Sequence, residues 1–315
     1  MTAPLKALGS ENPLVSLPVG NRSVLVVFNP TAGRGRGRLS EILRQLAASG
    51  CAVTLRETSG PGDAVRIMSK EGAAYDIVAV AGGDGTINEA ANGMDDGCDA
   101  PALAIIPRGT ANVLAWEIGL GTEASRTART IAEGQPQEIF AGLVNGRRFL
   151  MMAGVGFDAA VVASVTPRLK RALGKLAYVW RMVVELFRYD FPVFTVTIDG
   201  TAYQAASAVV AKGHFYGGQF VCAPDARLND PSFQVCLFLH GGRWNVLRYS
   251  IGLALGRLSK MSSIRILRGR HIAIDGPMGS PVQADGELVA ELPVTIDVYQ
   301  RRLTMIYPSQ DRVHG

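Results

Sequence analysis

The chain has 315 residues, enough for about two domains of roughly 150 residues each. Hydrophobic residues make up 48% and charged residues 19%, with 36 glycines, which is typical of a globular α/β protein. Disordered, collagen-like and coiled-coil classes are thereby excluded. The formal charge of +5 favours anionic partners such as phosphate groups, acidic membrane surfaces or nucleic acid, without choosing among them.

Two features of the sequence predict the cellular location of the protein. Residues 1–20 are interrupted by prolines and lack the apolar core of a signal peptide, so we expect a flexible N-terminal segment. No uncharged apolar segment reaches the roughly 18 residues that a membrane span requires. We therefore predict a cytoplasmic protein with at most peripheral membrane contact. Four cysteines without metal-site spacing are expected to be reduced and mostly buried, namely Cys51, Cys98, Cys222 and Cys236.

Strands alternate with helices in the first part of the chain. Short apolar, β-branched segments predict strands, and apolar residues spaced by three and four positions predict helices. This alternation predicts a parallel sheet covered on both faces. The predicted strands are residues 23–28, 52–58, 76–81 and 103–106, and the predicted helices are 39–49, 62–71 and 87–93.

The pattern changes near residue 135, and we place a domain boundary around 135–145. Short strands separated by turn residues predict an antiparallel sandwich or barrel. One helix, residues 168–189, begins after Pro167 and is basic first and then apolar and aromatic. The predicted strands are residues 149–153, 194–199, 205–210, 233–239, 263–267, 271–275 and 294–299.

The segment AGGDGTINE, residues 81–89, directly follows a predicted buried strand. Its glycines leave the backbone bare, so its N–H groups can approach a phosphate, and the following helix N-terminus adds a positive dipole. Asp84 would be repelled by phosphate unless a divalent cation or a substrate donor lies between them. The alternative is a turn in which the aspartate only serves the loop geometry.

Two other loops fall on the same edge of the predicted sheet. They are NPTAG, residues 29–33, and PRGTAN, residues 107–112. Arg34, Arg36 and Arg38 face phosphates in one interpretation and form a solvated basic turn in the other. Neither a Walker A motif nor the dinucleotide motif G-x-G-x-x-G is present.

Asp285 and Glu287 lie in QADGELV, a predicted strand-turn-strand. Residues two apart in an extended chain point the same way, so both carboxylates can face one cleft. A general base for a hydroxyl acceptor requires such a carboxylate. The alternative is an ordinary β-turn, for which Asp-Gly is common.

Taken in order, NPTAG, GGDGTINE, PRGTAN, YGGQFVCAPDARLND and DGE resemble the diacylglycerol kinase catalytic family. That family includes bacterial lipid kinases and the sphingosine and ceramide kinases. The resemblance covers about residues 22–308. It implies a kinase that uses ATP and Mg²⁺ and transfers the γ-phosphate to a hydroxyl of a neutral lipid of diacylglycerol, ceramide or sphingoid type.

The resemblance also implies an α/β fold with two domains. Residues 21–140 plus about 298–315 would form a Rossmann-like parallel nucleotide-binding domain, and residues 141–297 an antiparallel β-sandwich that binds the lipid. Residues 1–20 would precede both as a flexible segment. ATP would lie in the cleft between the two domains.

Site residues follow from the matched motifs. The resemblance implies that Glu287, assisted by Asp285, takes the proton from the lipid hydroxyl, and that Asp84 helps to organise Mg²⁺ and the phosphates. The residues that would bind ATP are Asn29, Thr58, Gly82, Gly83, Asp84, Gly85, Thr86, Asn88, Glu89, Gly109, Thr110 and Asn112.

The family has a metal site in the second domain, which maps onto Asp230 and the main-chain oxygens of Arg227 and Ser232. Pro231 stands where the family usually has glycine, and proline cannot adopt a positive φ, so this turn is expected to differ. Val113 stands where many bacterial diacylglycerol kinases have an aspartate. This departure looks closer to the sphingosine and ceramide branch, so the identity of the lipid stays open.

Expected partners follow from the same comparison. The predicted helix would meet anionic headgroups with Lys170, Arg171 and Lys175, while apolar residues would lie at the acyl boundary. Those apolar residues are Trp180, Leu186 and Phe187; alternatively, Val183, Leu186 and Phe187 are ordinary core. An exposed sheet edge would permit a homodimer, and no nucleic acid is expected. Two other functions are an NAD kinase and a non-catalytic lipid-binding protein of the same fold.

Overall fold

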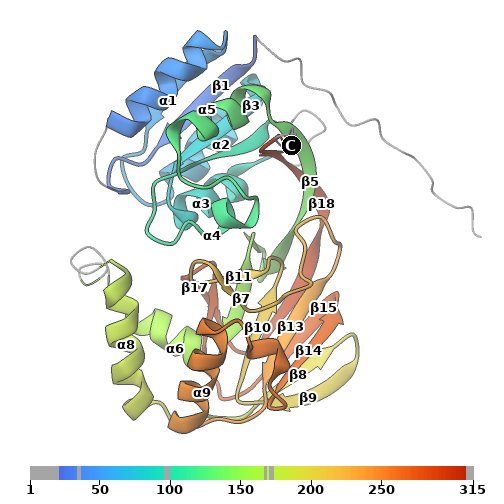
Figure 1. Ribbon diagram of the computed structural model, residues 1–315. Coiled ribbons are helices and arrows are strands. Elements are labelled where there is room, and N and C mark those ends of the chain that lie inside the picture. Colours follow the sequence, from blue (N-terminus) through green and yellow to red (C-terminus); the bar gives the residue numbers. More distant parts are fainter. Residues whose placement is uncertain (1–20, 34–36, 96–99, 167–168, 170–173, 310–315) are drawn as a thin grey trace, which may run out of the picture.

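The computed structural model describes residues 21–33, 37–95, 100–166, 169 and 174–309. Two lobes are stacked one above the other (Figure 1). We call residues 21–134 the first lobe and residues 147–293 the second lobe. Two long strands, β5 (Gln135–Val144) and β18 (Val294–Tyr307), pair with each other and run from one lobe into the other. The predicted segment 1–20 lies outside the described residues.

The first lobe is built on parallel strands in the order β2 (Ala52–Glu57), β1 (Ser23–Phe28), β3 (Ile77–Gly82) and β4 (Ala102–Pro107). The end of β18 joins this sheet beside β4, where Met305 pairs in parallel with Leu103. The parallel sheet expected from the alternation of strands and helices is therefore present. The helices are α1 (Gly37–Ala48), α2 (Asp63–Glu71), α3 (Asp84–Gly93), α4 (Val113–Glu117) and α5 (Ala124–Glu133), with a 3₁₀ turn η1 (Gly72–Ala74).

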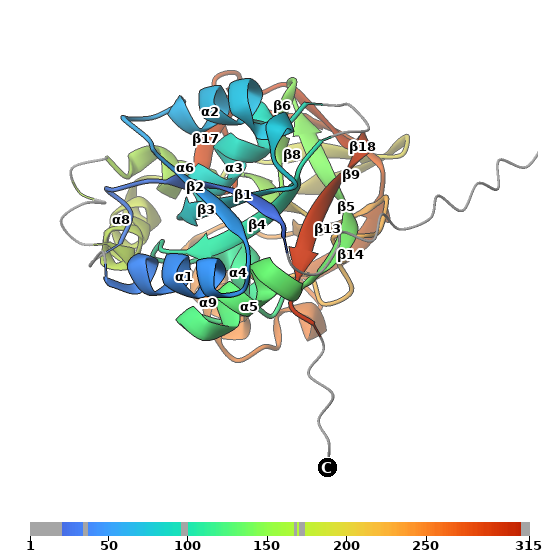
Figure 2. The same cartoon turned by 90° about the horizontal axis from the view of Figure 1, so that it is seen from above.

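Helices cover both faces of this sheet, with α1 and α5 on one side and α2 and α3 on the other (Figure 2). Strand β1 is apolar at almost every position because both of its faces are buried. Val24 and Val26 pack in the core under α1 and α5, whereas Leu25 and Val27 pack under α2 and α3. Two-sided burial thus explains the continuous apolar segments of the sequence.

The second lobe is an antiparallel β-sandwich. Its strands are β6 (Arg147–Phe149), β7 (Met152–Val155), β8 (Phe194–Ile198), β9 (Thr201–Ala205), β10 (Ser207–Ala211), β13 (Phe233–Phe238), β14 (Ile264–Gly269), β15 (His271–Asp275), β16 (Pro281–Ala284) and β17 (Glu287–Glu291). One layer has the order β14-β13-β10-β7-β16-β17, and the other continues the sheet of the first lobe through β18, β15, β8 and β9. Phe149, Phe194, Phe233 and Ile272 fill the space between the layers.

Smaller elements complete the second lobe. They are α6 (Phe157–Ser164), α8 (Lys175–Arg188), the hairpin β11 (Phe215–Tyr216) and β12 (Phe220–Val221), α9 (Arg243–Ala254) and the 3₁₀ turn η2 (Leu258–Lys260). Cys51, Cys222 and Cys236 are free and buried, as expected, while Cys98 lies outside the described residues. No helix in the described ranges is long and apolar enough to cross a bilayer.

One predicted strand, residues 149–153, is wrong, because the structure divides it into β6 and β7. Its backbone N–H groups at Leu150, Met151 and Met152 donate to the carboxylate of Asp285 instead of continuing the ladder. The predicted helix 87–93 begins three residues earlier, at Asp84, with Gly83 as its N-cap. The predicted helix 168–189 is described only as α8, since residues 167, 168 and 170–173 lie outside the described ranges.

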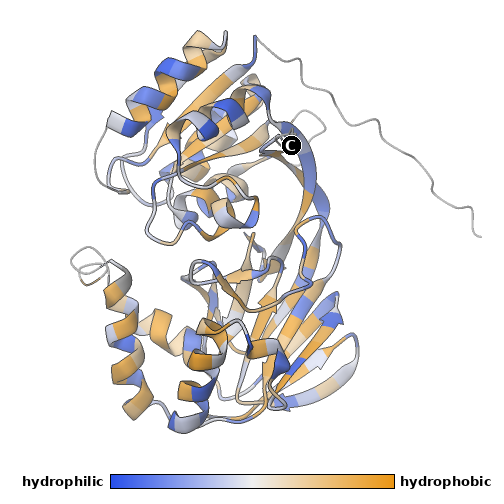
Figure 3. Cartoon of the chain, viewed as in Figure 1, coloured by the Kyte–Doolittle hydropathy of each residue, from blue (hydrophilic) through white to orange (hydrophobic). Residues whose placement is uncertain are grey.

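Helices α8 and α9 contain many hydrophobic residues (Figure 3), and several of their apolar side chains are exposed. On α8, Trp180 is 58% and Phe187 62% exposed, and on α9 Trp244 is 80% exposed. Val183 and Phe187 are therefore not core residues, whereas Leu186 is half-buried. Arg243 at the start of α9 lies over the Phe187 ring, so the two helices adjoin there. By the apolar surface of α8 and α9 we mean their exposed apolar residues together with Leu255 after α9, namely Leu176, Val179, Trp180, Val183, Phe187, Trp244, Leu247, Ile251 and Leu255.

Candidate active site

Three loops meet at the carboxyl edge of the parallel strands, after β1, β3 and β4. Asn29 follows β1 and donates through Nδ2 to Thr86 Oγ1 at 2.9 Å. Gly33 has φ +72°, and a Cβ there would lie 2.4 Å from the carbonyl oxygen of Arg108. Only glycine allows both this backbone conformation and this approach. The first and third loops are thus in direct backbone contact.

The second and third loops touch at a pair of glycines. A Cβ on Gly109 would lie 2.5 Å from the Cα of Gly83, and a Cβ on Gly83 would lie 3.1 Å from the Cα of Gly109. Asn112 closes the third loop with φ +48° and donates from Nδ2 to the carbonyl oxygen of Gly109 at 2.9 Å. Its Oδ1 is buried without a hydrogen bond among the described residues. Bare backbone from two loops therefore converges at one place.

Positive charge gathers beside these loops. Arg38 has two buried nitrogens, Nε and Nη2, that lack a hydrogen-bond partner in the described part of the chain. Burial lowers the pKa of the Arg38 guanidinium, and the nearby charge of Arg108 lowers it further. Arg108 lies over the Phe28 ring, 5.1 Å from its centroid. Bare backbone and two adjoining guanidinium groups fit a phosphate chain. Arg34 and Arg36 lie outside the described residues.

Asp84 opens α3 between the loops. Its Oδ1 accepts a hydrogen bond from the backbone N–H of Leu114, in the first turn of α4, at 3.3 Å. Burial raises the pKa of Asp84, and the N–H groups at the start of α4 act against that rise. The carboxylate therefore ties the PRGTAN loop to the GGDGT loop. Thr110 lies exposed on the former loop.

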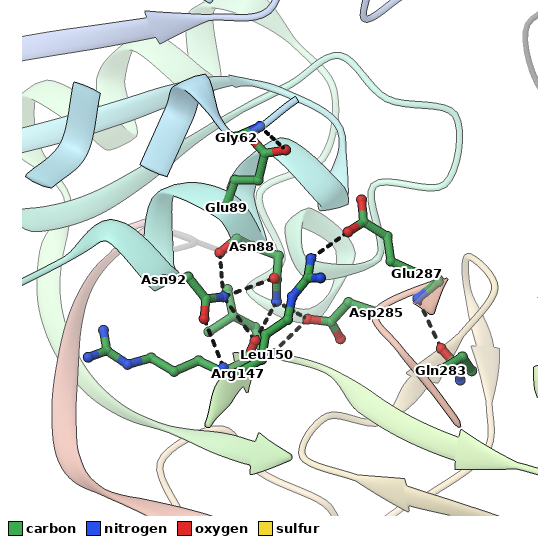
Figure 4. A network of polar contacts seen from close by, with 11 residues as sticks. Gly62, Asn88, Glu89, Asn92, Arg147, Leu150, Gln283, Asp285 and Glu287 are labelled. Atoms are coloured by element: carbon green, nitrogen blue, oxygen red, sulfur yellow. Dashed lines mark hydrogen bonds and ion pairs between the residues drawn. The ribbon is translucent and has the colours of Figure 1, made fainter. Parts of the chain in front are cut away.

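Glu287 reaches this region from the second lobe. Its Oε1 lies 2.6 Å from where a Cβ on Gly85 would be, so the carboxylate rests against the GGDGT loop. Its Oε2 pairs with Arg147 Nη2 at 2.6 Å, and both side chains are more than a third exposed (Figure 4). Glu287 thus lies beside the GGDGT loop, with access to solvent and one cationic partner. We call the GGDGT loop the phosphate loop, and the NPTAG, GGDGT and PRGTAN loops together the phosphate loops.

Asp285, two residues earlier, has the opposite environment. Its Oδ1 accepts the N–H groups of Met151 at 2.9 Å and Met152 at 3.0 Å, while Oδ2 accepts the N–H of Leu150 at 2.7 Å. Oδ2 also accepts Asn88 Nδ2 at 2.8 Å. Burial raises the pKa of Asp285, and these hydrogen bonds oppose the rise. With two donors on each oxygen, Asp285 holds the turn in place.

The contact of Asp285 with Asn88 is part of a joint between the lobes (Figure 4). Asn92, one turn after Asn88 on α3, donates to the carbonyl oxygen of Arg148 at 3.0 Å and accepts the Arg148 N–H at 2.8 Å. The Arg148 guanidinium then donates to the carbonyl of Ala91 at 2.9 Å and stacks on Tyr299 of β18. Helix α3 is thereby clamped to β6 and β18.

Several residues predicted to bind ATP serve the scaffold in this structure. Asn88 belongs to the joint just described. Glu89 Oε1 accepts the backbone N–H of Gly62, before α2, at 3.0 Å. Thr58 is buried, and its N–H donates to the carbonyl oxygen of Phe28 at 2.8 Å. Gly82 leaves room for Thr86, since a Cβ there would lie 2.6 Å from the Thr86 Cβ.

A second polar chain supports the turn from behind. Gly286 N–H donates to Gln283 Oε1 at 3.0 Å, and Gln283 Nε2 donates to Asp158 Oδ2 at 3.1 Å. Asp158 lies in the first turn of α6, and its Oδ1 is buried without a hydrogen bond in the described ranges. Burial raises the pKa of Asp158 to about 7. Neither Asp158 nor Arg147 was singled out from the sequence, because each acts through a partner more than a hundred residues away.

The second-domain metal site does not fit the residues present. The Lys212 ammonium lies among the carbonyl oxygens of Arg227, Asp230 and Ser232. The Asp230 carboxylate pairs with Arg268 at 2.6 Å. Among the described residues, no group of three or more His, Cys, Asp or Glu is arranged to hold a metal ion. We therefore assign no chemical step to a metal in this lobe.

The geometry fits a class of protein: a two-lobed phosphotransferase, with three adjoining loops of bare backbone on one lobe and a partly exposed carboxylate on the other. Comparison with known families agrees. Residues 23–144 match the diacylglycerol kinase catalytic domain, and residues 151–307 match the YegS C-terminal NAD kinase beta sandwich-like domain. The chain belongs to the diacylglycerol kinase catalytic-domain family and is a lipid kinase.

Individual relatives span nearly the whole chain. A diacylglycerol kinase of Bacillus subtilis (strain 168) is 28% identical over 292 residues, covering 90% of this chain and 96% of that protein. One from Staphylococcus carnosus (strain TM300) is 26% identical over 274 residues, covering 85% and 89%. A crystal structure of a diacylglycerol kinase from Bacillus anthracis str. Sterne has a TM-score of 0.74 and 27% identity, covering 91% of this chain and 97% of that one.

Proposed function

We propose that this enzyme transfers the γ-phosphoryl group of ATP to the free hydroxyl of diacylglycerol, the lipid for which its relatives are named. One observation carries the proposal. The Glu287 carboxylate of the second lobe rests against Gly85 of the phosphate loop in the first lobe. A hydroxyl bound between the lobes would thus meet a base and a phosphoryl donor together.

The nucleotide phosphates would bind to the bare backbone at Gly83 and Gly109, beside the guanidinium groups of Arg38 and Arg108. Asn29, Thr86, Thr110 and Asn112 line the same three loops. Mg²⁺ carried by the nucleotide would neutralise charge that develops on the phosphoryl group. Asp84 is the carboxylate within the phosphate loop, and it keeps the second and third loops together.

Glu287 acts as the general base in this proposal. The lipid oxygen forms a bond to the γ-phosphorus, the bond from that phosphorus to the bridging oxygen of ADP breaks, and Glu287 holds the hydroxyl proton. Arg147 orients the carboxylate through the 2.6 Å ion pair. Asp285 holds the backbone from which Glu287 extends.

The lipid would arrive along the apolar surface of α8 and α9. Helix α8 starts beside the phosphate loops, since a Cβ on Gly174 would lie 3.9 Å from Thr110 Cγ2. We propose that this surface contacts an anionic membrane peripherally. A Trp180→Ser/Phe187→Ser variant should co-sediment less with phosphatidylglycerol vesicles than the wild type, with Leu55→Ser, an exposed apolar residue on β2, as control. Undiminished binding would remove this surface from the proposal.

Other acceptors of the phosphoryl group, and two other functions, are alternatives to this proposal. Val113 is buried at the start of α4 and places no carboxylate there, which keeps ceramide and sphingoid lipids as alternatives. An NAD kinase would bind a soluble acceptor and would not need the exposed helices α8 and α9. A non-catalytic lipid-binding protein would not need Glu287 beside Gly85. A homodimer and a cytoplasmic, peripherally attached location stay predictions.

The test is a transfer assay with purified full-length protein, γ-labelled ATP and Mg²⁺. Diacylglycerol, ceramide, sphingosine and monoacylglycerol are offered in separate mixed micelles, with NAD as a soluble acceptor. Label in diacylglycerol is expected. Label in another lipid would identify that lipid as the acceptor in place of diacylglycerol. Label in NADP would favour the NAD kinase. Lipid binding without transfer would favour the non-catalytic alternative.

A further inference from the structure

The Lys212 side chain ends inside the second lobe, in a cage of oxygen atoms. Lys212 is fully buried. Its Nζ donates to the carbonyl oxygens of Arg227 at 3.3 Å and Ser232 at 3.2 Å, and also to that of Asp230. An ammonium group has three N–H donors, and here each has a main-chain acceptor. A buried charge requires such partners, and this one has a full set.

The surroundings complete the cage. The rings of Phe140 and Phe233 lie with centroids 5.8 Å and 6.0 Å from the Lys212 Nζ, within the range of cation–π attraction. The carboxylate next to the cage is also occupied. Arg268 Nη2 donates to both oxygens of Asp230, at 2.7 Å and 2.6 Å, and Ser232 Oγ donates to its Oδ1 at 3.0 Å.

These are the groups that the family resemblance assigns to a metal ion: the Asp230 carboxylate and the main-chain oxygens of Arg227 and Ser232. One ammonium and one guanidinium with one carboxylate have a formal charge of +1, the same as one divalent cation with one carboxylate. Pro231, in place of the usual glycine, lies in the turn that carries these groups. The same charge balance is therefore reached without an ion.

We propose that Lys212 is a built-in replacement for the metal ion of the second lobe. Its ammonium occupies the carbonyl cage, Arg268 neutralises Asp230, and the lobe binds no structural divalent cation. The inference concerns this cage alone and does not depend on the proposed acceptor or on the nucleotide.

Backbone hydrogen bonds connect the cage to the strands beside the DGE turn. The Lys212 N–H donates to the carbonyl oxygen of Met151 at 2.8 Å, and the Met151 N–H donates to Asp285 at 2.9 Å. The Phe140 N–H of β5 donates to the carbonyl oxygen of Leu228, within the turn that forms the cage, at 2.8 Å. Lys212 thus holds the turn of residues 227–232 against the strands that support Asp285.

The first test uses the full-length protein without nucleotide. Mn²⁺ binding is measured by electron paramagnetic resonance in the wild type and in Asp230→Asn. We expect the same binding in both, and the same unfolding temperature in EDTA as in millimolar Mg²⁺. One stoichiometric Mn²⁺ site in the wild type that Asp230→Asn removes would overturn the proposal. This pair decides the question even if Lys212 variants fail to fold.

The second test exposes the cage. Lys212→Ala/Arg268→Ala frees the carbonyl oxygens and the carboxylate together. We expect its unfolding temperature in EDTA to fall by more than about 5 °C, and Mg²⁺ or Mn²⁺ to restore part of that loss. Lys70→Ala, an exposed lysine on α2, is the matched control and should show neither effect. A folded double variant with no gain in Mn²⁺ binding would contradict the equivalence of ammonium and metal ion. Neither readout involves kinase activity.

Discussion

Each lobe has a cluster of main-chain polar groups, and the two clusters differ in whether the protein itself supplies their hydrogen-bond partners. At the phosphate loops, Gly83 and Gly109 leave backbone bare, and two nitrogens of Arg38 lack a partner among the described residues. At the turn of residues 227–232, the carbonyl oxygens already have the Lys212 ammonium. A cluster of backbone groups binds a ligand only where the chain does not supply the partner itself.

The same contrast separates the two carboxylates of the DGE turn. Glu287 is partly exposed with a single ion pair, whereas Asp285 accepts two donors on each oxygen. Substitution of a partly exposed group with one partner, such as Glu287, should lower activity with little change in stability. Substitution of a group with two donors on each oxygen, such as Asp285, should lower stability first. Substitutions of Glu287 and Asp285 test this division, and substitutions of Asp158 and Gly109 test the groups around them.

Glu287→Gln should have the largest effect. It removes the proposed base while keeping shape and polarity, so kcat should fall by about 10²- to 10⁴-fold. Its ion pair with Arg147 is partly exposed, so stability should change by less than about 1 kcal/mol. Lipid phosphorylation and denaturant unfolding measure the two quantities. Glu291→Gln, at the other end of β17, is the control, and an active Glu287→Gln enzyme would disprove the base assignment.

Asp285→Asn should act mainly on stability. The amide nitrogen of asparagine would face N–H donors that now contact a carboxylate oxygen. Leaving such buried donors without an acceptor should cost about 2–4 kcal/mol in the free energy of unfolding. Urea unfolding measures this loss. A variant with wild-type stability but no activity would instead make Asp285 part of the proton transfer.

Asp158→Asn should change the pH dependence of stability. The folded pKa of about 7 lies above the usual value of 3.8, so the folded state retains a proton that the unfolded state loses. The contribution of Asp158 to stability therefore falls as pH rises from about 4 to 7. Asparagine has no such loss, and the variant should be more stable than the wild type by about 2–4 kcal/mol at pH 8, but not at pH 4. Parallel curves at all pH values would contradict this account.

Gly109→Ala should have the smallest overall effect, and we expect it in both stability and nucleotide binding. Its Cβ would lie 2.5 Å from the Cα of Gly83, so the loops must separate. We expect a loss of about 1–3 kcal/mol in stability and weaker ATP binding by calorimetry. Gly60→Ala is the control for adding a methyl group to a glycine, because a Cβ there would meet nothing within 4 Å and φ is not positive. Unchanged ATP binding would place the phosphates elsewhere.

Much of the fold could be predicted because it follows from local pattern. The strands of residues 23–28 and 103–106 are apolar throughout since both of their faces are buried, and each lies within a residue of its predicted bounds. The prediction of one strand over residues 149–153 was wrong because backbone N–H groups in this segment donate to Asp285, a side chain more than 130 residues away. Short-range periodicity contains no information about such a partner.

The sequence alone determined the order of strands and helices, the three glycine-rich loops and the DGE turn, because backbone conformation and burial leave periodic and compositional signals in consecutive residues. Tertiary structure alone decided which polar group is available and which is already bound. Asp285 accepts a hydrogen bond from Asn88, which is 197 residues away in the sequence. Lys212 donates to carbonyl oxygens 15 to 20 residues further along the chain. Those pairings depend on how the sheets stack, and no local pattern encodes that geometry.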